Sequence, residues 1–322
     1  MKAVYIEQPG GIDAMRYGDF PTPQPGPGEV LVKIAYSGVN FIDTYHRSGL
    51  YKLPLPAVIG SEASGTVEKL GEGVTGFKPG ERVAYTLARG SYAEFQSVPA
   101  AQLVKIPDNV DDATAAASML QGCTAHYLTH STFPLKKGQT ALVHAAAGGT
   151  GRLIVQMASM IGARVIATVG SEAKAKLTLG DGASDAILYN TQDFVAETKR
   201  LTDGKGVEVV YDGVGQATVH KGFDCLKPRG MMVAFGNSSG PAAPVDLLML
   251  SQKGSLYVTR PTLFTYMASR EDLEWRSSDM FRWIGEGKLK INIDRIYPLA
   301  EAAQAQADLE GRKTTGKLIL KA

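Results

Sequence analysis

The sequence predicts an α/β protein that combines a doubly wound parallel sheet with a second domain rich in β-strands. The first observation is an alternation of strand-like and helical patterns across residues 140–235, which is typical of βαβ units. The second is a series of short strand-like runs, separated by Gly and Pro, across residues 1–118. The third is a last strand-like run at residues 315–320, which indicates that the chain returns to its first domain.

The N-terminal region has the pattern of a compact, barrel-like β domain. Its apolar runs are short, alternate with polar residues and are bounded by turn residues. The expected strands are residues 2–6, 29–37, 63–70, 81–85 and 91–98. A helical pattern then begins at Asp111 and ends at His130, where it leads into the next domain.

The middle region predicts a parallel sheet with helices on both faces. The expected strands are residues 140–145, 164–169, 186–188, 207–212 and 230–235, and the expected helices are residues 151–160, 172–179, 192–201 and 218–225. Ligands of such sheets bind beyond the carboxyl ends of the strands. Those ends carry Gly, Ser or Asn, and they are residues 145–148, 170–171, 212–215 and 235–238.

A further strand is expected at residues 254–260 and a helix at residues 271–285. We therefore expect a nucleotide-binding domain over residues 122–260. The β-rich domain is expected to consist of residues 1–121 and 261–322.

The turn after the first strand of the middle region carries the spacing A-x-G-x-x-G, at Ala146, Gly148 and Gly151. Small residues let the backbone turn sharply, let a phosphate approach, and let the helix pack closely against the strand. The start of that helix offers unpaired N–H groups to an anion. The same spacing also occurs where a strand and a helix simply pack closely, so dinucleotide binding and packing both remain open from this motif alone.

The end of the second strand favours NADPH over NADH. An NAD site usually has an acid about 20 residues beyond the glycines, where it accepts a hydrogen bond from the ribose 2′-hydroxyl. Here Gly170 and Ser171 end the strand, and Lys174 follows one helical turn later. A hydroxyl and a cation suit a 2′-phosphate, while Glu172 fits the start of a helix and can point to solvent.

Composition excludes several classes of function. Lys and Arg number 34 against 32 Asp and Glu, without the clustered basic run of a nucleic-acid-binding face, so nucleic acid is an unlikely partner. No apolar stretch reaches 18 residues, so we expect no membrane partner and a cytoplasmic location. His126 and His130 stand four residues apart on one expected helix, but without a further ligand they are expected to be packed or solvated rather than to bind zinc.

Four motifs in order resemble the NADPH:quinone oxidoreductases, the zeta-crystallin-like branch of the medium-chain dehydrogenase/reductases. They are residues 144–151, 209–215, 235–240 and 254–261, and the likeness extends over nearly the whole chain, including residues 38–49. The resemblance implies a chaperonin-10-like (GroES-like) catalytic domain made from both chain ends, a Rossmann domain between them, and a homodimer.

The resemblance also implies an enzyme that needs no metal. Zinc-dependent alcohol dehydrogenases of the same superfamily place Cys and His where this chain has Asn40 and Ser61. Without a Lewis acid to stabilise an alkoxide, alcohol oxidation is unfavourable. An electron-poor quinone or activated alkene accepts a hydride with less electrostatic assistance.

The resemblance implies roles for individual residues. Asn40 and Tyr45 are expected to orient the nicotinamide and the acceptor, and Asp43 to order their loop. Tyr51 and Arg260 are expected to meet the acceptor oxygen as it gains charge, although Tyr51 fits equally well as a wall of the cleft. The expected NADPH contacts are Asn40, Phe41, Tyr45, Thr124, Tyr127, Gly148, Gly149, Thr150, Gly170, Ser171, Lys174, Tyr189, Gly213, Val214, Phe235, Gly236, Asn237, Ser238 and Lys317.

The leading hypothesis is hydride transfer from NADPH to a quinone. Reduction of an activated C=C bond, as in enone or haloacrylate reductases, is the alternative within the same chemistry. A non-catalytic role, as a crystallin-like protein or a binder of single-stranded nucleic acid, is the alternative from another class. The chain departs from the family pattern Leu-Lys-Gly at Gln121, which leaves the acceptor preference open.

The homodimer is expected to form through an edge strand that begins at Ser255 and ends at Thr259. Leu256 and Val258 alternate with Tyr257, so both faces of this strand carry apolar surface. Pairing with the same strand of a second copy would satisfy its exposed backbone groups under two-fold symmetry.

Overall fold

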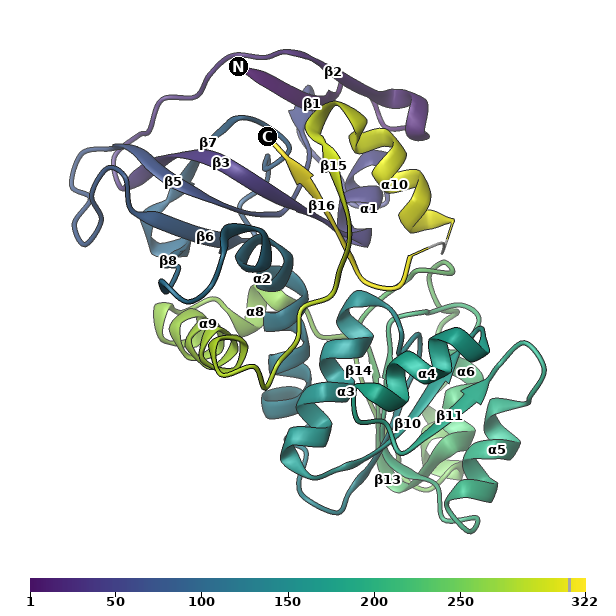
Figure 1. Cartoon of the computed structure of the whole chain (residues 1–322). Coiled ribbons are helices and arrows are strands. Elements are labelled where there is room, and N and C mark those ends of the chain that lie inside the picture. Colours follow the sequence, from purple (N-terminus) through teal and green to yellow (C-terminus); the bar gives the residue numbers. More distant parts are fainter. Residues whose placement is uncertain (312–313) are drawn as a thin grey trace. The chain divides into compact units, whose positions relative to one another are not determined.

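The computed structural model describes residues 1–311 and 314–322. Residues 312 and 313, which belong to the expected catalytic domain, lie outside the described residues. The chain divides into two compact units, which are residues 1–123 with 267–322 (the β-rich unit) and residues 124–266 (the α/β unit) (Figure 1). The units divide after residues 123 and 266, which is two and six residues later than the boundaries expected after residues 121 and 260.

The β-rich unit contains a seven-stranded sheet with the order β15-β16-β3-β5-β6-β8, in which β7 also pairs with β3. Its strands are β3 (Glu29–Val39), β5 (Glu62–Leu70), β6 (Arg82–Thr86), β7 (Phe95–Pro99), β8 (Leu103–Lys105), β15 (Ile293–Pro298) and β16 (Lys317–Lys321). A smaller sheet, with the order β2-β1-β4, consists of β1 (Lys2–Ile6), β2 (Met15–Asp19) and β4 (Ala57–Val58).

The last strand returns to the first part of the chain, as the sequence predicts. β16 pairs antiparallel with β3, with Leu318 opposite Val39 and Leu320 opposite Ser37 (Figure 1). Both leucines are buried, so the strand is held by apolar packing as well as by its backbone hydrogen bonds. This register carries Lys317 to the end of β3.

Four helices complete the β-rich unit. They are α1 (Phe41–Ser48), α2 (Asp112–Tyr127), which continues into the α/β unit, α9 (Arg270–Gly285) and α10 (Ala302–Glu310). α9 begins at the cap residue Ser269, whose side chain accepts a hydrogen bond from the backbone N–H of Asp272. Within the described residues, no helix has both the length and the apolar character needed to cross a bilayer.

The α/β unit contains a six-stranded, all-parallel sheet with the order β11-β10-β9-β12-β13-β14. Its strands are β9 (Thr140–Val143), β10 (Arg164–Val169), β11 (Asp185–Leu188), β12 (Val207–Asp212), β13 (Leu226–Ala234) and β14 (Tyr257–Thr259). The strand order reverses beside β9, because β10 lies on one side of β9 and β12 on the other. The predicted doubly wound sheet is therefore confirmed.

The helices of the α/β unit connect these strands, except α8, which follows the last of them (Figure 1). They are α3 (Gly149–Ile161), α4 (Glu172–Gly180), α5 (Phe194–Leu201), α6 (Val219–Gly222), α7 (Leu247–Gln252) and α8 (Leu263–Tyr266), with a π-helical turn at Leu128–Thr132 after α2. An apolar core that includes Leu142, Ile166 and Val210 lies within the sheet and the helices packed on it.

The edge strand β14 is shorter than expected. It starts at Tyr257 instead of Ser255, because Gly254 (φ 105°) and Ser255 (φ 56°) have left-handed backbone conformations that a strand does not accommodate. Leu256, just before the strand, is buried, so the apolar surface of the strand itself comes from Tyr257 and Val258. The expected position of this strand at the edge of the parallel sheet is confirmed.

Candidate active site

Asn40 lies where β3 ends and α1 begins. Its backbone N–H donates to Oδ2 of Asp43 at 2.9 Å, and its carbonyl accepts from the backbone N–H of Asp43 at 3.1 Å. This pairing of a cap residue with an acid three residues later is a typical start of a helix. The expectation that Asp43 orders a loop is therefore wrong, because residues 41–48 form α1 and Asp43 stabilises its first turn.

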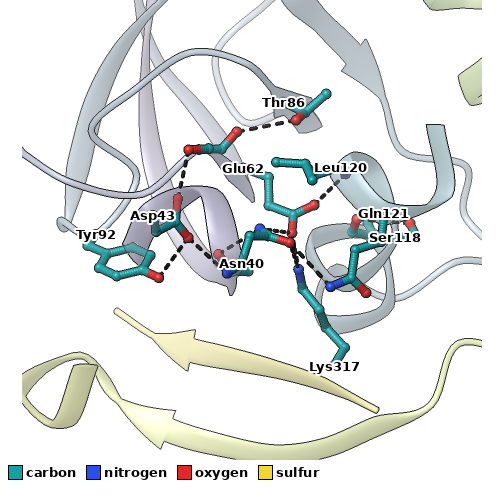
Figure 2. Close-up of polar contacts among 12 residues, drawn as sticks. Asn40, Asp43, Glu62, Thr86, Tyr92, Ser118, Leu120, Gln121 and Lys317 are labelled. Carbon is teal, nitrogen blue, oxygen red and sulfur yellow. Dashed lines mark hydrogen bonds and ion pairs between the residues drawn. The ribbon is translucent and has the colours of Figure 1, made fainter. Parts of the chain in front are cut away.

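The side-chain amide of Asn40 has partners for each of its donors and acceptors (Figure 2). Nδ2 donates to Oε1 of Glu62 at 2.7 Å and to the carbonyl of Gly38 at 3.4 Å. Oδ1 accepts from Nζ of Lys317 at 2.7 Å and from Nε2 of Gln121 at 3.3 Å. Since an amide offers two N–H donors and two lone pairs, its orientation is fixed by residues of the same unit.

Glu62 and Lys317 form a buried ion pair beside Asn40 (Figure 2), with side chains 0% and 2% exposed. They come from β5 and β16, the two strands that flank β3. The pair can form across β3 because the residue between them is Gly38, where a Cβ atom would lie 2.1 Å from Oε1 of Glu62. The second oxygen of Glu62 accepts from the backbone N–H of Leu120 at 2.5 Å.

This arrangement changes the interpretation of two residues. Lys317 is among the expected cofactor contacts, but its ammonium lies inside the unit and is bonded to Glu62 and Asn40. Glu62 is absent from the expected site, although it is the anion on which the whole polar centre depends. We call Asn40, Glu62, Lys317 and Gln121 the polar centre.

Asp43 is a buried carboxyl with three donors around it. Its oxygens accept from the backbone of Asn40, from the hydroxyl of Ser61 at 2.7 Å and from the hydroxyl of Tyr92 at 2.9 Å (Figure 2). Burial outweighs these hydrogen bonds and raises the pKa of Asp43 to about 6. Burial, together with the nearby Asp43 carboxyl, raises the pKa of Tyr92 well above its usual value, so Tyr92 stays a neutral donor.

The raised pKa of Asp43 predicts a measurable effect of pH on stability. A carboxyl with a pKa of 3.8 in the unfolded chain and about 6 in the folded protein binds its proton more tightly when folded. Its contribution to the free energy of unfolding therefore falls as pH rises through this window, by about 2–3 kcal/mol in total. The difference in unfolding free energy between wild type and Asp43→Asn, from urea titrations at pH 5 and pH 7.5, should shift in that direction.

The comparison with Asp43→Asn is needed because His46 has the opposite effect. Burial, helped by the charge of Arg89, lowers the pKa of His46 to about 4. The contribution of His46 to the free energy of unfolding therefore falls as pH falls. The variant retains His46, and the difference between the two proteins cancels its contribution. Parallel stability profiles for wild type and Asp43→Asn would contradict the prediction.

Aromatic side chains follow Asn40 along α1 and the turn after it. The ring centroids of Phe41 and Tyr45 are 6.5 Å apart, and those of Tyr45 and Tyr51 are 5.4 Å apart with an edge-on orientation. His46 also meets Tyr51 edge-on at 6.0 Å. The backbone N–H of Tyr51 donates to the carbonyl of Tyr45 at 3.0 Å, which holds the turn against the helix. The structure thus brings together three of the expected contacts, Phe41, Tyr45 and Tyr51; we call these three rings and His46 the aromatic cluster.

The two side chains at the expected zinc-ligand positions take part in other interactions. The amide of Asn40 belongs to the polar centre, and the hydroxyl of Ser61 donates to Oδ1 of Asp43. Among residues 1–311 and 314–322, no group of three or more His, Cys, Asp or Glu has a metal-binding arrangement. His126 and His130 stack on each other with centroids 4.3 Å apart, and His126 is fully buried.

The glycine-rich turn of the α/β unit has the close packing that its spacing predicts. Gly148 caps α3, and its N–H donates to the carbonyl of Ala145 at 2.9 Å. A Cβ atom at Gly151 would lie 2.4 Å from that same carbonyl oxygen and 2.8 Å from Cα of Ala146. Only glycine allows this approach, which leaves the backbone N–H groups of Gly149 and Thr150 at the start of the helix.

A second set of expected cofactor residues meets at the end of β10. Ser171 caps α4, and its hydroxyl accepts from the backbone N–H of Lys174 at 3.3 Å. The Tyr189 hydroxyl approaches Gly170 closely, since a Cβ atom there would lie 2.7 Å from it. Asn190, which the sequence analysis does not single out, donates to the carbonyl of Gly170 at 2.8 Å and fixes this turn.

The loops after β12 and β13 pack on each other. A Cβ atom at Gly236 would lie 2.3 Å from the carbonyl oxygen of Gly213, and the backbone N–H of Ser238 donates to that carbonyl at 3.3 Å. Asp212 organises the first loop, because its carboxylate accepts from the backbone N–H groups of Val214 at 2.7 Å and of Gly215 at 2.9 Å.

Arg260 lies at the second of these loops. It donates to the carbonyl of Ala234 at 2.8 Å, and it lies 3.1 Å from the side-chain oxygen of Asn237 in the amide orientation that satisfies both groups. Of the other expected contacts, Phe235 packs near Gly213. Tyr127 is buried and stacks on Tyr266 with centroids 4.5 Å apart, and Thr124 is also buried.

A cavity of about 930 Å³ in the β-rich unit contains none of the expected site residues. It lies between α9 and the segment 100–109. Two arginines that line it are paired with carboxylates of α9, Arg270 with Glu274 and Arg282 with Asp279. The candidate site residues of the β-rich unit are therefore those of the polar centre and the aromatic cluster. Those of the α/β unit are in the loops after its strands.

Comparison with known proteins identifies the family of the chain. Residues 26–108 match the alcohol dehydrogenase GroES-like domain, and residues 182–320 match the model described as zinc-binding dehydrogenase. A parallel dinucleotide-type sheet and a GroES-like unit with a buried polar centre define a dehydrogenase-type oxidoreductase.

Individual relatives show which family of oxidoreductases the chain belongs to. A quinone oxidoreductase of Pseudomonas aeruginosa is 46% identical over 321 residues, 99% of each chain. A 2-haloacrylate reductase of Burkholderia is 42% identical, covering 99% of this chain and 98% of its own. The crystal structure of Escherichia coli quinone oxidoreductase complexed with NADPH matches with a TM-score of 0.98 and 41% identity, covering 100% of both chains. The chain belongs to the quinone oxidoreductase family of the medium-chain dehydrogenase/reductases.

Proposed function

We propose that this protein is an NADPH-dependent quinone oxidoreductase that works without a metal. The observation that carries the proposal is the polar centre, in which the amide of Asn40, at a position where zinc enzymes of the superfamily place a ligand, is bonded to a buried Lys–Glu pair. Family membership, with identities above 40% to quinone oxidoreductases over nearly the whole chain, supports the reaction class.

The α/β unit fits NADPH at three places. The turn at Gly148–Gly151 offers helix N–H groups to the pyrophosphate, since no side chain intervenes. Gly170, Ser171, Lys174 and Tyr189 form a hydroxyl-rich and cationic end for the 2′-phosphate. The loops that contain Gly213, Val214 and Phe235–Ser238 would line the rest of the groove. When bound, NADPH supplies the hydride for reduction of the acceptor.

The cofactor assignment predicts the effect of Lys174→Ala. Loss of one charged hydrogen bond to a 2′-phosphate should weaken NADPH binding by about 1.5–3 kcal/mol and leave NADH binding nearly unchanged. Calorimetric titration of both cofactors measures the two values. Lys176→Ala, which removes an exposed lysine from the same helix, is the matched control. An equal loss of affinity for NADPH and NADH would overturn the assignment.

The β-rich unit would contribute positioning. Because the amide of Asn40 is saturated by Glu62, Lys317, Gln121 and Gly38, we assign it the role of a fixed support from which Phe41 and Tyr45 project toward the nicotinamide and acceptor. A support with every hydrogen bond formed does not reorganise when the acceptor binds. Tyr51 and Arg260 are proposed to face the acceptor oxygen as it gains negative charge.

A second reaction, reduction of an activated C=C bond, is favoured by the 42% identity to a 2-haloacrylate reductase. One experiment separates the two: NADPH oxidation measured side by side with 1,4-benzoquinone, 2-cyclohexenone and 2-chloroacrylate. We expect kcat/KM to be higher for the quinone by at least about ten-fold. Reduction of a C=C bond needs an acid that protonates the α-carbon, and the buried carboxyl of Asp43 is bonded to Asn40, Ser61 and Tyr92 instead. Faster reduction of either alkene would reverse the assignment.

We also propose that the protein is a homodimer. β14 is an edge strand whose Tyr257 is 57% exposed, and α7, which leads into it, has Leu247 76% and Leu248 62% exposed. Together these form an apolar patch beside unpaired backbone groups, which natural edge strands rarely leave uncovered. Two-fold pairing of β14 with its copy would bury the patch and continue the sheet.

A further inference from the structure

Arg89 stands in a short loop that is held tightly in the β-rich unit. Leu87, two residues before it, has a left-handed backbone with φ 75°, which is a strained conformation for a branched side chain. The N–H of Leu87 donates to the carbonyl of Ser61, and the N–H of Gly90 donates to that of Gly60, both at 2.9 Å. The loop is therefore bound along the segment that also carries Ser61 and Glu62.

The backbone of Arg89 itself is anchored. Its carbonyl accepts from Nε2 of Gln96 at 2.7 Å, and Gln96 is buried and accepts from the hydroxyl of Tyr85. The side chain, by contrast, is exposed. Across the described residues, the guanidinium of Arg89 has no carboxylate partner and no hydrogen bond. The fold thus anchors the backbone of Arg89 while no carboxylate of the described residues neutralises its guanidinium.

The charge of Arg89 acts on the aromatic cluster. The loop of Arg89 lies beside α1, because it is hydrogen-bonded to Gly60 and Ser61, and the hydroxyl of Ser61 donates to Asp43, one helical turn before His46. Burial and, to a smaller extent, the charge of Arg89 lower the pKa of His46. His46 meets Tyr51 edge-on, and Tyr51 meets Tyr45, so the loop of Arg89 lies beside the helix that carries the rings proposed to hold the acceptor. Lys52, which follows Tyr51 directly, is also exposed. Of the carboxylates nearby on α1, Asp43 is buried and bonded within the unit.

We propose that Arg89 forms an anion subsite beside the aromatic cluster, which makes the enzyme prefer quinones that carry a negatively charged substituent, such as a sulfonate or carboxylate. This proposal rests on the proposed function, because the quinone ring is assigned to the aromatic cluster. The rings offer a flat apolar surface, and the guanidinium offers two parallel N–H donors that can pair with two oxygens of a carboxylate or a sulfonate. His46 is neutral at physiological pH and does not compete as a second cation.

The test compares two acceptors with the same ring system. Steady-state kcat/KM is measured for 1,4-naphthoquinone and for 1,4-naphthoquinone-2-sulfonate, and the ratio of the two values is compared between variants, so that the difference in reduction potential cancels. Arg89→Ala should lower the ratio for the sulfonate by about ten-fold, the effect of one charge-assisted contact at an exposed border. Arg89→Lys should retain part of the preference, and Arg89→Glu should lower the ratio further than Arg89→Ala.

The matched control is Arg16→Ala, which removes an exposed arginine from β2 of the same unit and changes the net charge by the same amount. Its ratio should equal that of wild type. An unchanged ratio in Arg89→Ala, or an equal change in Arg16→Ala, would refute the subsite.

A binding measurement separates this proposal from the proposed function. Calorimetric titration with naphthalene-2-sulfonate requires no turnover, and its affinity should fall about ten-fold in Arg89→Ala while it is retained in Arg16→Ala. If wild type reduced neither quinone but bound the sulfonate through Arg89, the proposed function would be wrong and the subsite would stand. Equal affinity in both variants would remove the subsite while leaving quinone reduction intact.

Discussion

Glu62→Gln is expected to lower the free energy of unfolding by about 3–5 kcal/mol, because it leaves the buried ammonium of Lys317 without its anion. Both side chains of this pair are almost completely inaccessible to solvent, at 0% and 2% exposed, so water cannot replace the lost partner. Gln has nearly the size of Glu, which separates the loss of charge from the opening of a cavity. Urea unfolding followed by circular dichroism measures the change.

The double variant Glu62→Gln/Lys317→Met provides the decisive comparison. Removing both charges leaves neither ion unpaired, so the double variant should be more stable than the sum of the single losses by about 1–3 kcal/mol. The exposed pair of Lys288 and Glu286 supplies the control, since Glu286→Gln should leave the free energy of unfolding nearly unchanged. Additive losses at Glu62 and Lys317 would show that the two residues do not act as a pair.

Val258→Pro is expected to convert the proposed dimer to a monomer or to insoluble protein with little NADPH oxidation. Proline removes an N–H group from the edge strand β14 and cannot extend a sheet across two subunits. Because this variant also strains the strand within its own chain, Leu247→Glu is the sharper test. Leu247 is 76% exposed in the single chain, so a charge there should hardly affect folding of the subunit.

In a dimer, the same charge would be buried without a partner, at a penalty on the order of several kcal/mol. Leu179→Glu is the matched control, since Leu179 is 45% exposed on α4, which packs on β11 at the opposite edge of the sheet. Light scattering at micromolar concentration should give a dimer for wild type and for Leu179→Glu, and a monomer for Leu247→Glu. A wild-type monomer would contradict the assembly.

The alternation of strands and helices was enough to predict the parallel sheet. β10 and β12 have the predicted bounds, and the helices α3 and α4 differ from prediction by one or two residues at their ends. These elements are well predicted because each is buried on a regular face and bounded by Gly or a cap residue. The spacing of the glycines likewise predicts a close approach that Gly151 makes in the structure.

Short edge elements were not predictable in the same way. β2, β4 and β15 have few buried residues, and β8 has only three residues, so each depends on a neighbouring strand for its conformation. α1 was expected as a loop because its eight residues are too few for a clear helical period and mix aromatic with charged side chains. The sequence signal that could have revealed it is Asn40 followed three residues later by Asp43, a typical helix start.

For the candidate site, the sequence by itself determined the tight glycine-rich turn, the position of Ser171 and Lys174 at the end of a strand, and the presence of Asn40 and Ser61 where related zinc enzymes have ligands. Only the tertiary structure decided that Lys317 and Asn40, 277 residues apart, form a hydrogen bond and that Glu62 pairs with Lys317. No local pattern encodes this contact, because it depends on the register of β16 and β5 on either side of β3 and on the missing side chain of Gly38. A buried charge is stable only where its partner is brought to it, and that placement is a property of the assembled sheet.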